Sequence, residues 1–110
     1  MKDPYTKTPF WRPSVAECEA LRTHLLAELP VGHALWPPSD RLQVIARDRN
    51  GDRIVVRTGI AVTPVALVHM SWAGRPPMAP FLPETEFYAS DEELIAAVHD
   101  APAPNGARRA

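Results

Sequence analysis

The dipeptide Asn50-Gly51 stands between two segments of alternating apolar and polar residues, and this arrangement constrains the fold more than any other sequence feature. Residues Leu42 to Asp48 precede the dipeptide, and residues Asp52 to Thr58 follow it. Asn-Gly between such segments is a strong β-hairpin signal, because both residues readily adopt the left-handed backbone of a tight turn. The chain is therefore expected to contain an antiparallel sheet.

The apolar residues of this hairpin predict its register. A two-residue loop would place Arg47 opposite Ile54 and would mix charged and apolar side chains on each face. A three-residue loop places Ala46 opposite Ile54 instead. It also places Val44 opposite Val56, which gives one apolar face, and a buried face is what fixes register. We therefore expect the bulged, three-residue loop. The other face then carries Gln43, Ile45, Arg47, Arg53, Val55 and Arg57.

Two further segments are expected to join the sheet. The run from Pro64 to Trp72 is the most apolar of the chain and predicts a central strand. Residues Glu84 to Tyr88 predict an edge strand. Between the two, the segment from Gly74 to Pro83 holds five prolines or glycines, a composition that excludes regular structure.

Two capping boxes predict two helices. Ser14 with Glu17 begins the first helix, which ends before a Pro-x-Gly sequence. Ser90 with Glu93 begins a second, short helix through about Val98. The apolar stripe of the first helix consists of Val15, Cys18, Leu21, Leu25, Leu26 and Leu29.

These elements predict an α+β fold. It comprises a three- to four-stranded antiparallel sheet with an N-terminal helix and a short C-terminal helix, in the order α-β-β-β-(β)-α. Residues 1–13 are expected to form an irregular arm whose aromatic side chains fold back onto the domain. Residues 14–100 are expected to form a single α+β domain, and residues 101–110 a disordered tail.

Charge and composition exclude several classes of function. A formal net charge of −1 provides no large basic field to attract phosphates, so nucleic acid is not expected as a partner. The single cysteine, Cys18, has no second thiol for a disulfide and is expected in the protein core, at the centre of the apolar stripe of the first helix. The chain shows neither a signal-peptide pattern nor an apolar run of the roughly 20 residues that span a bilayer. We expect a cytoplasmic protein with no membrane partner.

Three segments resemble a group of small bacterial proteins of unassigned function. They read LPVGHALW at 29–36, VHMSW at 68–72 and ETEFYASDEEL at 84–94. Met70 and Ser71 stand where that group is expected to have Leu and Thr. The resemblance covers most of residues 15–95 and implies the α+β outline above. It implies no activity, because none is known for the group.

His33 and His69 are the histidines that could form a ligand site. His33 lies in a loop after the first helix, and His69 lies in the central strand. If the loop folds over the sheet, the two imidazoles converge on a small molecule. Trp72 would form a stacking wall only if the strand twists near its end, and a carboxylate such as Glu84 or Asp91 would have to orient one ring. The alternative, which we favour, is that each histidine satisfies buried backbone groups and fixes a loop to the sheet.

No metal or cofactor is expected. No pair of histidines or cysteines has the close spacing of a zinc site. Asp48, Asn50 and Asp52 imitate the start of a calcium loop. However, Arg53 stands where that loop needs glycine, and Gly59 stands where it needs a bidentate glutamate.

The charged residues are unevenly distributed. Residues 41–57 contain five arginines and two aspartates, whereas residues 84–100 contain six acids and no lysine or arginine. In one interpretation, Glu84 and Glu86 pair with the hairpin arginines and contribute little energy at a surface. In the other, the arginines read an anionic patch on a partner protein, beside apolar side chains of the proline-rich loop. The residues of this candidate partner-binding surface are Arg47, Arg53, Arg57, Met78 and Phe81.

From these features we expect a non-catalytic, protein-binding accessory domain, comparable to an immunity protein, adaptor or regulator. The expectation rests mainly on the lack of a recognisable catalytic constellation in the sequence. The expected partner is another protein, and a homodimer is left open. The alternative is a small-molecule-binding protein or a small enzyme that uses His33 and His69.

Overall fold

The computed structural model describes residue 5 and residues 8–49, 52–72, 75 and 82–100. Within these residues, five strands form one antiparallel sheet in the order β1-β2-β3-β4-β5. The expected α+β fold, with an N-terminal helix and a short C-terminal helix, is confirmed, although the sheet has five strands where three or four were predicted. The elements are β1 (Phe10–Trp11), α1 (Val15–Glu28), a 3-10 turn (Ser39–Arg41), β2 (Gln43–Asp48), β3 (Arg53–Arg57), β4 (Val65–His69), β5 (Thr85–Tyr88) and α2 (Asp91–Asp100).

β1 is the strand that the sequence pattern did not predict. Its two residues lie between Pro9 and Pro13, inside the segment expected to be an irregular arm, and they pair with the end of β2. Prolines are compatible with this position, because the outer side of an edge strand needs no N–H donors. The predicted tail, residues 101–110, lies outside the described residues.

Both helices begin where the capping boxes predict. In the first, the Ser14 hydroxyl accepts a hydrogen bond from the Glu17 backbone N–H at 3.2 Å, and the Glu17 carboxylate accepts one from the Ser14 N–H at 3.1 Å. In the second, the Ser90 hydroxyl accepts from the Glu93 N–H at 3.1 Å. These bonds satisfy N–H groups that the helix itself leaves without partners.

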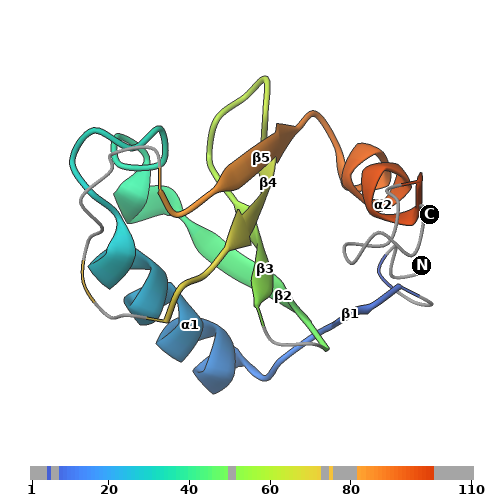
Figure 1. The fold of residues 1–110 in the computed structure, drawn as a ribbon, viewed down its shortest axis with the longest axis horizontal. Coiled ribbons are helices and arrows are strands. Elements are labelled where there is room, and N and C mark those ends of the chain that lie inside the picture. Colours follow the sequence, from blue (N-terminus) through green and yellow to red (C-terminus); the bar gives the residue numbers. More distant parts are fainter. Residues whose placement is uncertain (1–4, 6–7, 50–51, 73–74, 76–81, 101–110) are drawn as a thin grey trace, which may run out of the picture.

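The two helices pack on opposite faces of the sheet (Figure 1). α1 covers one face, where its leucines contact apolar residues of β2, β3 and β4. α2 and the N-terminal arm cover the other face through Leu94, Tyr5 and Phe10. Tyr5 and Phe10 are each only 2% exposed, so these two aromatic side chains of the arm do fold back onto the domain. Because both faces are covered, the strands at the centre of the sheet are apolar on both sides.

The register of β2 on β3 differs from the prediction in one half of the hairpin. Val44 lies opposite Val56 as expected, but Ala46 lies opposite Val55 and not opposite Ile54. The prediction placed the extra residue in the loop, whereas the structure places a register shift between Val44 and Ala46. Such a bulge turns the following side chains to the other face. Ala46 therefore packs on the α2 side, while Val44 packs on the α1 side.

Candidate functional site

His33 is a structural histidine that fixes the loop after α1 to the beginning of β5. Its ring is 4% exposed. Nδ1 accepts a hydrogen bond from the Leu35 N–H at 2.9 Å, and Nε2 lies 2.8 Å from the Pro83 carbonyl oxygen. A carbonyl oxygen only accepts, so the proton is on Nε2. Both ring nitrogens are thus used by buried backbone groups.

His69 lies on the opposite face of the sheet. The hydroxyl of Thr85 is 3.3 Å from His33 Nε2, and Thr85 pairs with Val68 on the α1 side. His69 follows Val68 directly, so its side chain points to the α2 side. The structure therefore does not bring the two candidate histidines together. His69 Nε2 is buried and has no hydrogen-bond partner among the described residues.

Trp72 lies on the α1 side, where it is half-buried against the core. The Arg47 guanidinium carbon lies over the indole ring, 5.0 Å from its centroid. The His24 ring packs edge-to-face against the indole, with 5.7 Å between the ring centroids. Its backbone has a φ of 62°, which bulky residues rarely adopt. Trp72 thus lies three residues after the end of β4, on the face opposite His69.

A buried carboxylate next to Trp72 was not singled out from the sequence. Glu28 is 1% exposed, and its Oε1 accepts hydrogen bonds from the Ser71 N–H at 3.1 Å and the Ser71 hydroxyl at 3.0 Å. Helical spacing indicates that Glu28 is buried, because it lies seven residues after Leu21 and three after Leu25 and so shares their face of the helix. This carboxylate fixes the segment after β4 to the last turn of α1.

The three arginines of the candidate partner-binding surface lie on two faces of the sheet. Arg47 faces α1, where it stacks on the Trp72 ring as described above. Arg53 and Arg57 face α2, where each is paired with a carboxylate. Arg53 Nε is 2.6 Å from Asp48 Oδ2. The structure thus does not gather these arginines into one patch, and Met78 and Phe81 lie outside the described residues.

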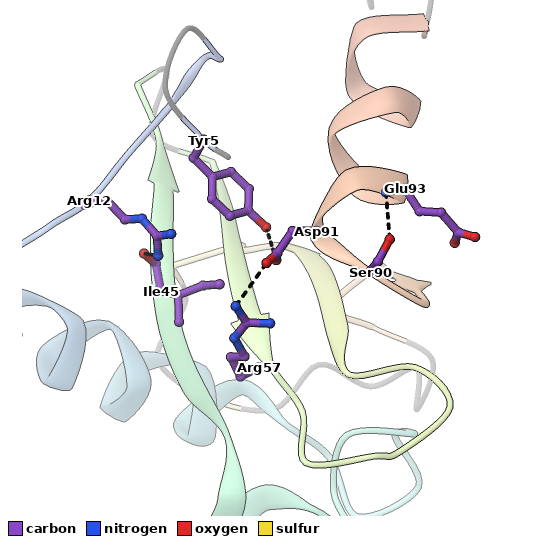
Figure 2. Close-up of polar contacts among 7 residues, drawn as sticks. All are labelled: Tyr5, Arg12, Ile45, Arg57, Ser90, Asp91 and Glu93. Carbon is purple, nitrogen blue, oxygen red and sulfur yellow. Dashed lines mark hydrogen bonds and ion pairs between the residues drawn. The ribbon is translucent and has the colours of Figure 1, made fainter. Parts of the chain in front are cut away.

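Arg57 belongs to a junction between three distant parts of the chain (Figure 2). Asp91, the first residue of α2, accepts a hydrogen bond from the Tyr5 hydroxyl at 2.7 Å and one from Arg57 Nη2 at 3.0 Å. The Arg12 guanidinium lies over the Tyr5 ring at 4.9 Å. Burial, followed by the hydrogen bond to Asp91, raises the pKa of Tyr5 above its ordinary value. The junction holds the arm and α2 against the sheet.

Cys18 is half-buried and not at the centre of the core. Its thiol lines an open groove of about 250 Å³ between α1 and β2, together with Val15 and Arg22. Burial, with Glu17 as the next contribution, raises the pKa of this thiol. A raised pKa keeps the thiol protonated at neutral pH, which makes it a poor nucleophile.

β5 is an edge strand of the sheet (Figure 1). The His69 N–H donates to the Glu84 carbonyl at 2.9 Å, so His69 and Glu84 occupy a hydrogen-bonded position of the ladder. Because such pairs alternate in antiparallel strands, the backbones of Glu86 and Tyr88 also face β4. The backbones of Thr85 and Phe87 therefore face outward, and no described residue is hydrogen-bonded to them.

Four carboxylates belong to β5, to the residue before it and to the first turn of α2. Their residues are Glu84, Glu86, Glu92 and Glu93, all of which are exposed. None of the four forms an ion pair with another described residue. Glu86 Oε1 accepts a hydrogen bond from the Tyr88 hydroxyl at 3.1 Å. Burial, followed by this hydrogen bond, raises the pKa of Tyr88 to about 12. The free edge of β5 and these four carboxylates are the candidate functional site.

The described residues contain no cluster of three or more His, Cys, Asp or Glu arranged to hold a metal ion. Among the same residues, no helix has the length and apolar character needed to cross a bilayer. In comparisons with known proteins, no family model, no curated protein and no solved structure matches the chain.

Proposed function

We propose that this chain is a non-catalytic protein-binding domain that accepts an extended segment of its partner as an additional strand along β5. It would act as an accessory domain of the adaptor, regulator or immunity type, in the cytoplasm. The observation that carries the proposal is the outward-facing backbone of Thr85 and Phe87, which has no hydrogen-bond partner among the described residues. An open sheet edge binds an extended peptide through main-chain hydrogen bonds.

The geometry gives less support to the alternative, a ligand site built on His33 and His69. The two rings lie on opposite faces of the sheet, and both nitrogens of His33 are used by backbone groups. It also gives less support to a basic surface, because Arg53 and Arg57 are each paired with an aspartate. The edge of β5 is the feature whose binding groups remain available among the described residues.

A proline substitution tests this proposal. Thr85 is the first residue of β5 and its N–H faces outward, a position in an edge strand where proline is tolerated. Thr85→Pro removes one donor from the binding edge, whereas the control Thr85→Val removes only the side-chain hydroxyl. The probes are three pentapeptides that alternate valine with lysine, threonine or glutamate, titrated by NMR.

We expect at least one pentapeptide to shift the amide signals of Thr85 and Phe87 in the unchanged protein. Thr85→Pro should weaken that binding about fivefold, the equivalent of one lost hydrogen bond, and Thr85→Val should not. Thermal unfolding of both variants establishes that they are folded. Equal binding to the proline variant, or no binding of any pentapeptide at β5, would contradict the proposal.

A further inference from the structure

We infer that the segment accepted by β5 is basic, with lysine or arginine at alternate positions on the α2 side of the sheet. This inference rests on the proposed function and specifies the class of partner. It follows from the direction of the β5 side chains and from the absence of compensating cations among the described residues around them.

Side chains of β5 alternate between the two faces of the sheet. Glu86 pairs with Leu67, and Leu67 packs on the α2 side. Glu84 lies two residues earlier and faces the same side. An added strand would place every second side chain on that side, next to these two carboxylates. Cross-strand pairs of opposite charge stabilise a sheet, and like charges destabilise it.

Among the described residues, the arginines of the sheet that share this face are already engaged. Arg53 pairs with Asp48 at 2.6 Å, and Arg57 pairs with Asp91 at 3.0 Å. Asp91 is thereby neutralised, whereas Glu92 and Glu93 in the first turn of α2 are exposed and form no ion pair with a described residue, although Glu93 accepts a hydrogen bond from the Ala89 N–H. A basic segment would supply the missing positive charge. The concentration of negative charge would also speed its association at low salt.

The same charges disfavour two other occupants. A second copy of the chain, paired through its own β5, would bring the two Glu86 carboxylates onto the same face within a few residues of each other. A nucleic acid would bring phosphates to an edge that is already negative. A basic extended peptide avoids both repulsions.

The opposite side of the added strand has a different character. Thr85 and Phe87 are partly buried and face α1, with Phe87 packed against the core. Partner side chains on this side would contact a threonine and an aromatic ring rather than carboxylates. The expected partner segment therefore alternates basic residues with apolar ones.

The three pentapeptides also test this inference. In low salt we expect the lysine peptide to bind β5 about tenfold more tightly than the glutamate peptide, with the threonine peptide between them. The double variant Glu84→Gln/Glu86→Gln should abolish this preference. The control Glu19→Gln, which removes an exposed carboxylate from α1, should leave it unchanged.

The outcomes separate the two proposals. If the three peptides shift Thr85 and Phe87 with equal affinity, the basic preference is wrong and the strand-binding function stands. A lysine preference that survives in the double glutamine variant also overturns the inference, because β5 would not be its source. If no peptide shifts Thr85 or Phe87, the proposed function fails, and the inference fails with it.

Discussion

The Tyr5 hydroxyl donates a hydrogen bond of 2.7 Å to Asp91 Oδ1, although the two residues lie 86 positions apart in the sequence. Figure 2 shows the phenol of the arm meeting the first residue of α2, with Arg57 of β3 on the other carboxylate oxygen. This contact joins the N-terminal arm to α2 on one face of the sheet. It also fixes the beginning of α2 directly after β5, next to the proposed binding edge.

Tyr5→Phe is expected to lower the free energy of unfolding by about 1–2 kcal/mol, because it removes a largely buried hydrogen bond to a charged group. Denaturant unfolding measures the change. Tyr88→Phe is the matched control, since it removes a more exposed hydrogen bond to Glu86, and we expect it to cost less than about 1 kcal/mol. Equal losses in the two variants would show that the junction does not stabilise the domain.

Both tyrosines are expected to ionise at a higher pH than a free tyrosine does. The chain contains two tyrosines, and the fold raises the pKa of both, that of Tyr88 to about 12. A raised pKa means that the fold favours the neutral phenol. The stabilisation that the neutral phenols contribute to the folded state is therefore fully present below pH 10, the ordinary pKa of tyrosine. It is lost as the pH rises from there through the folded-state pKa. Ultraviolet absorbance should show little tyrosinate at pH 10, and half-ionisation there would contradict the burial of these rings.

The loss of stability on substituting Glu28 or Ser71 should increase with the number of hydrogen bonds that the substitution removes. Glu28→Ala deprives the Ser71 N–H and hydroxyl of their acceptor and leaves a cavity, so we expect a loss of about 2–4 kcal/mol. Ser71→Ala removes one of the two bonds and should cost about 1 kcal/mol. Thermal unfolding gives the order. If Glu28→Ala cost no more than Ser71→Ala, the carboxylate would not be fixing the segment after β4.

The two central histidines should respond in opposite ways. His33→Ala leaves the Leu35 N–H without its acceptor and removes one of the two hydrogen bonds that the Pro83 carbonyl accepts, so we expect a loss of about 2–3 kcal/mol. His69→Leu removes a buried nitrogen that has no partner among the described residues, so it should be neutral or stabilising. Denaturant unfolding of both variants measures this contrast. Similar destabilisation by both would mean that His69 also holds a structural bond.

Local sequence signals predicted most of the elements of this fold. The capping boxes at Ser14 and Ser90 gave the beginnings of both helices, because a cap involves residues only three positions apart. Alternation around Asn50-Gly51 gave the positions of β2 and β3, and the most apolar run of the chain gave that of β4. The bulge in β2 was not predictable in this way, since Ala46 is small enough to fit either face, and the choice depends on what covers each face. β1 was missed because two residues between prolines carry no periodicity.

The candidate site was less predictable from the sequence, because pairing between distant residues determines it. The sequence shows an excess of acidic residues from residue 84 onward. It does not show which of these residues form ion pairs. Arg57 pairs with Asp91 because the fold places β3 beside the first turn of α2. The Thr85 and Phe87 amides face outward because of the register in which β5 pairs with β4. The sequence of β5 alone does not indicate which of its residues direct their backbone groups toward β4.

Amide hydrogen exchange along β5 tests the central claim most directly. In the free protein, the amides of Glu86 and Tyr88 should exchange slowly because they bond to β4, while those of Thr85 and Phe87 should exchange fast. With the lysine-valine pentapeptide bound, Thr85 and Phe87 should become protected, and Glu86 and Tyr88 should change little. Slow exchange of Thr85 and Phe87 in the free protein, or their fast exchange in the complex, would contradict an open edge that accepts a strand.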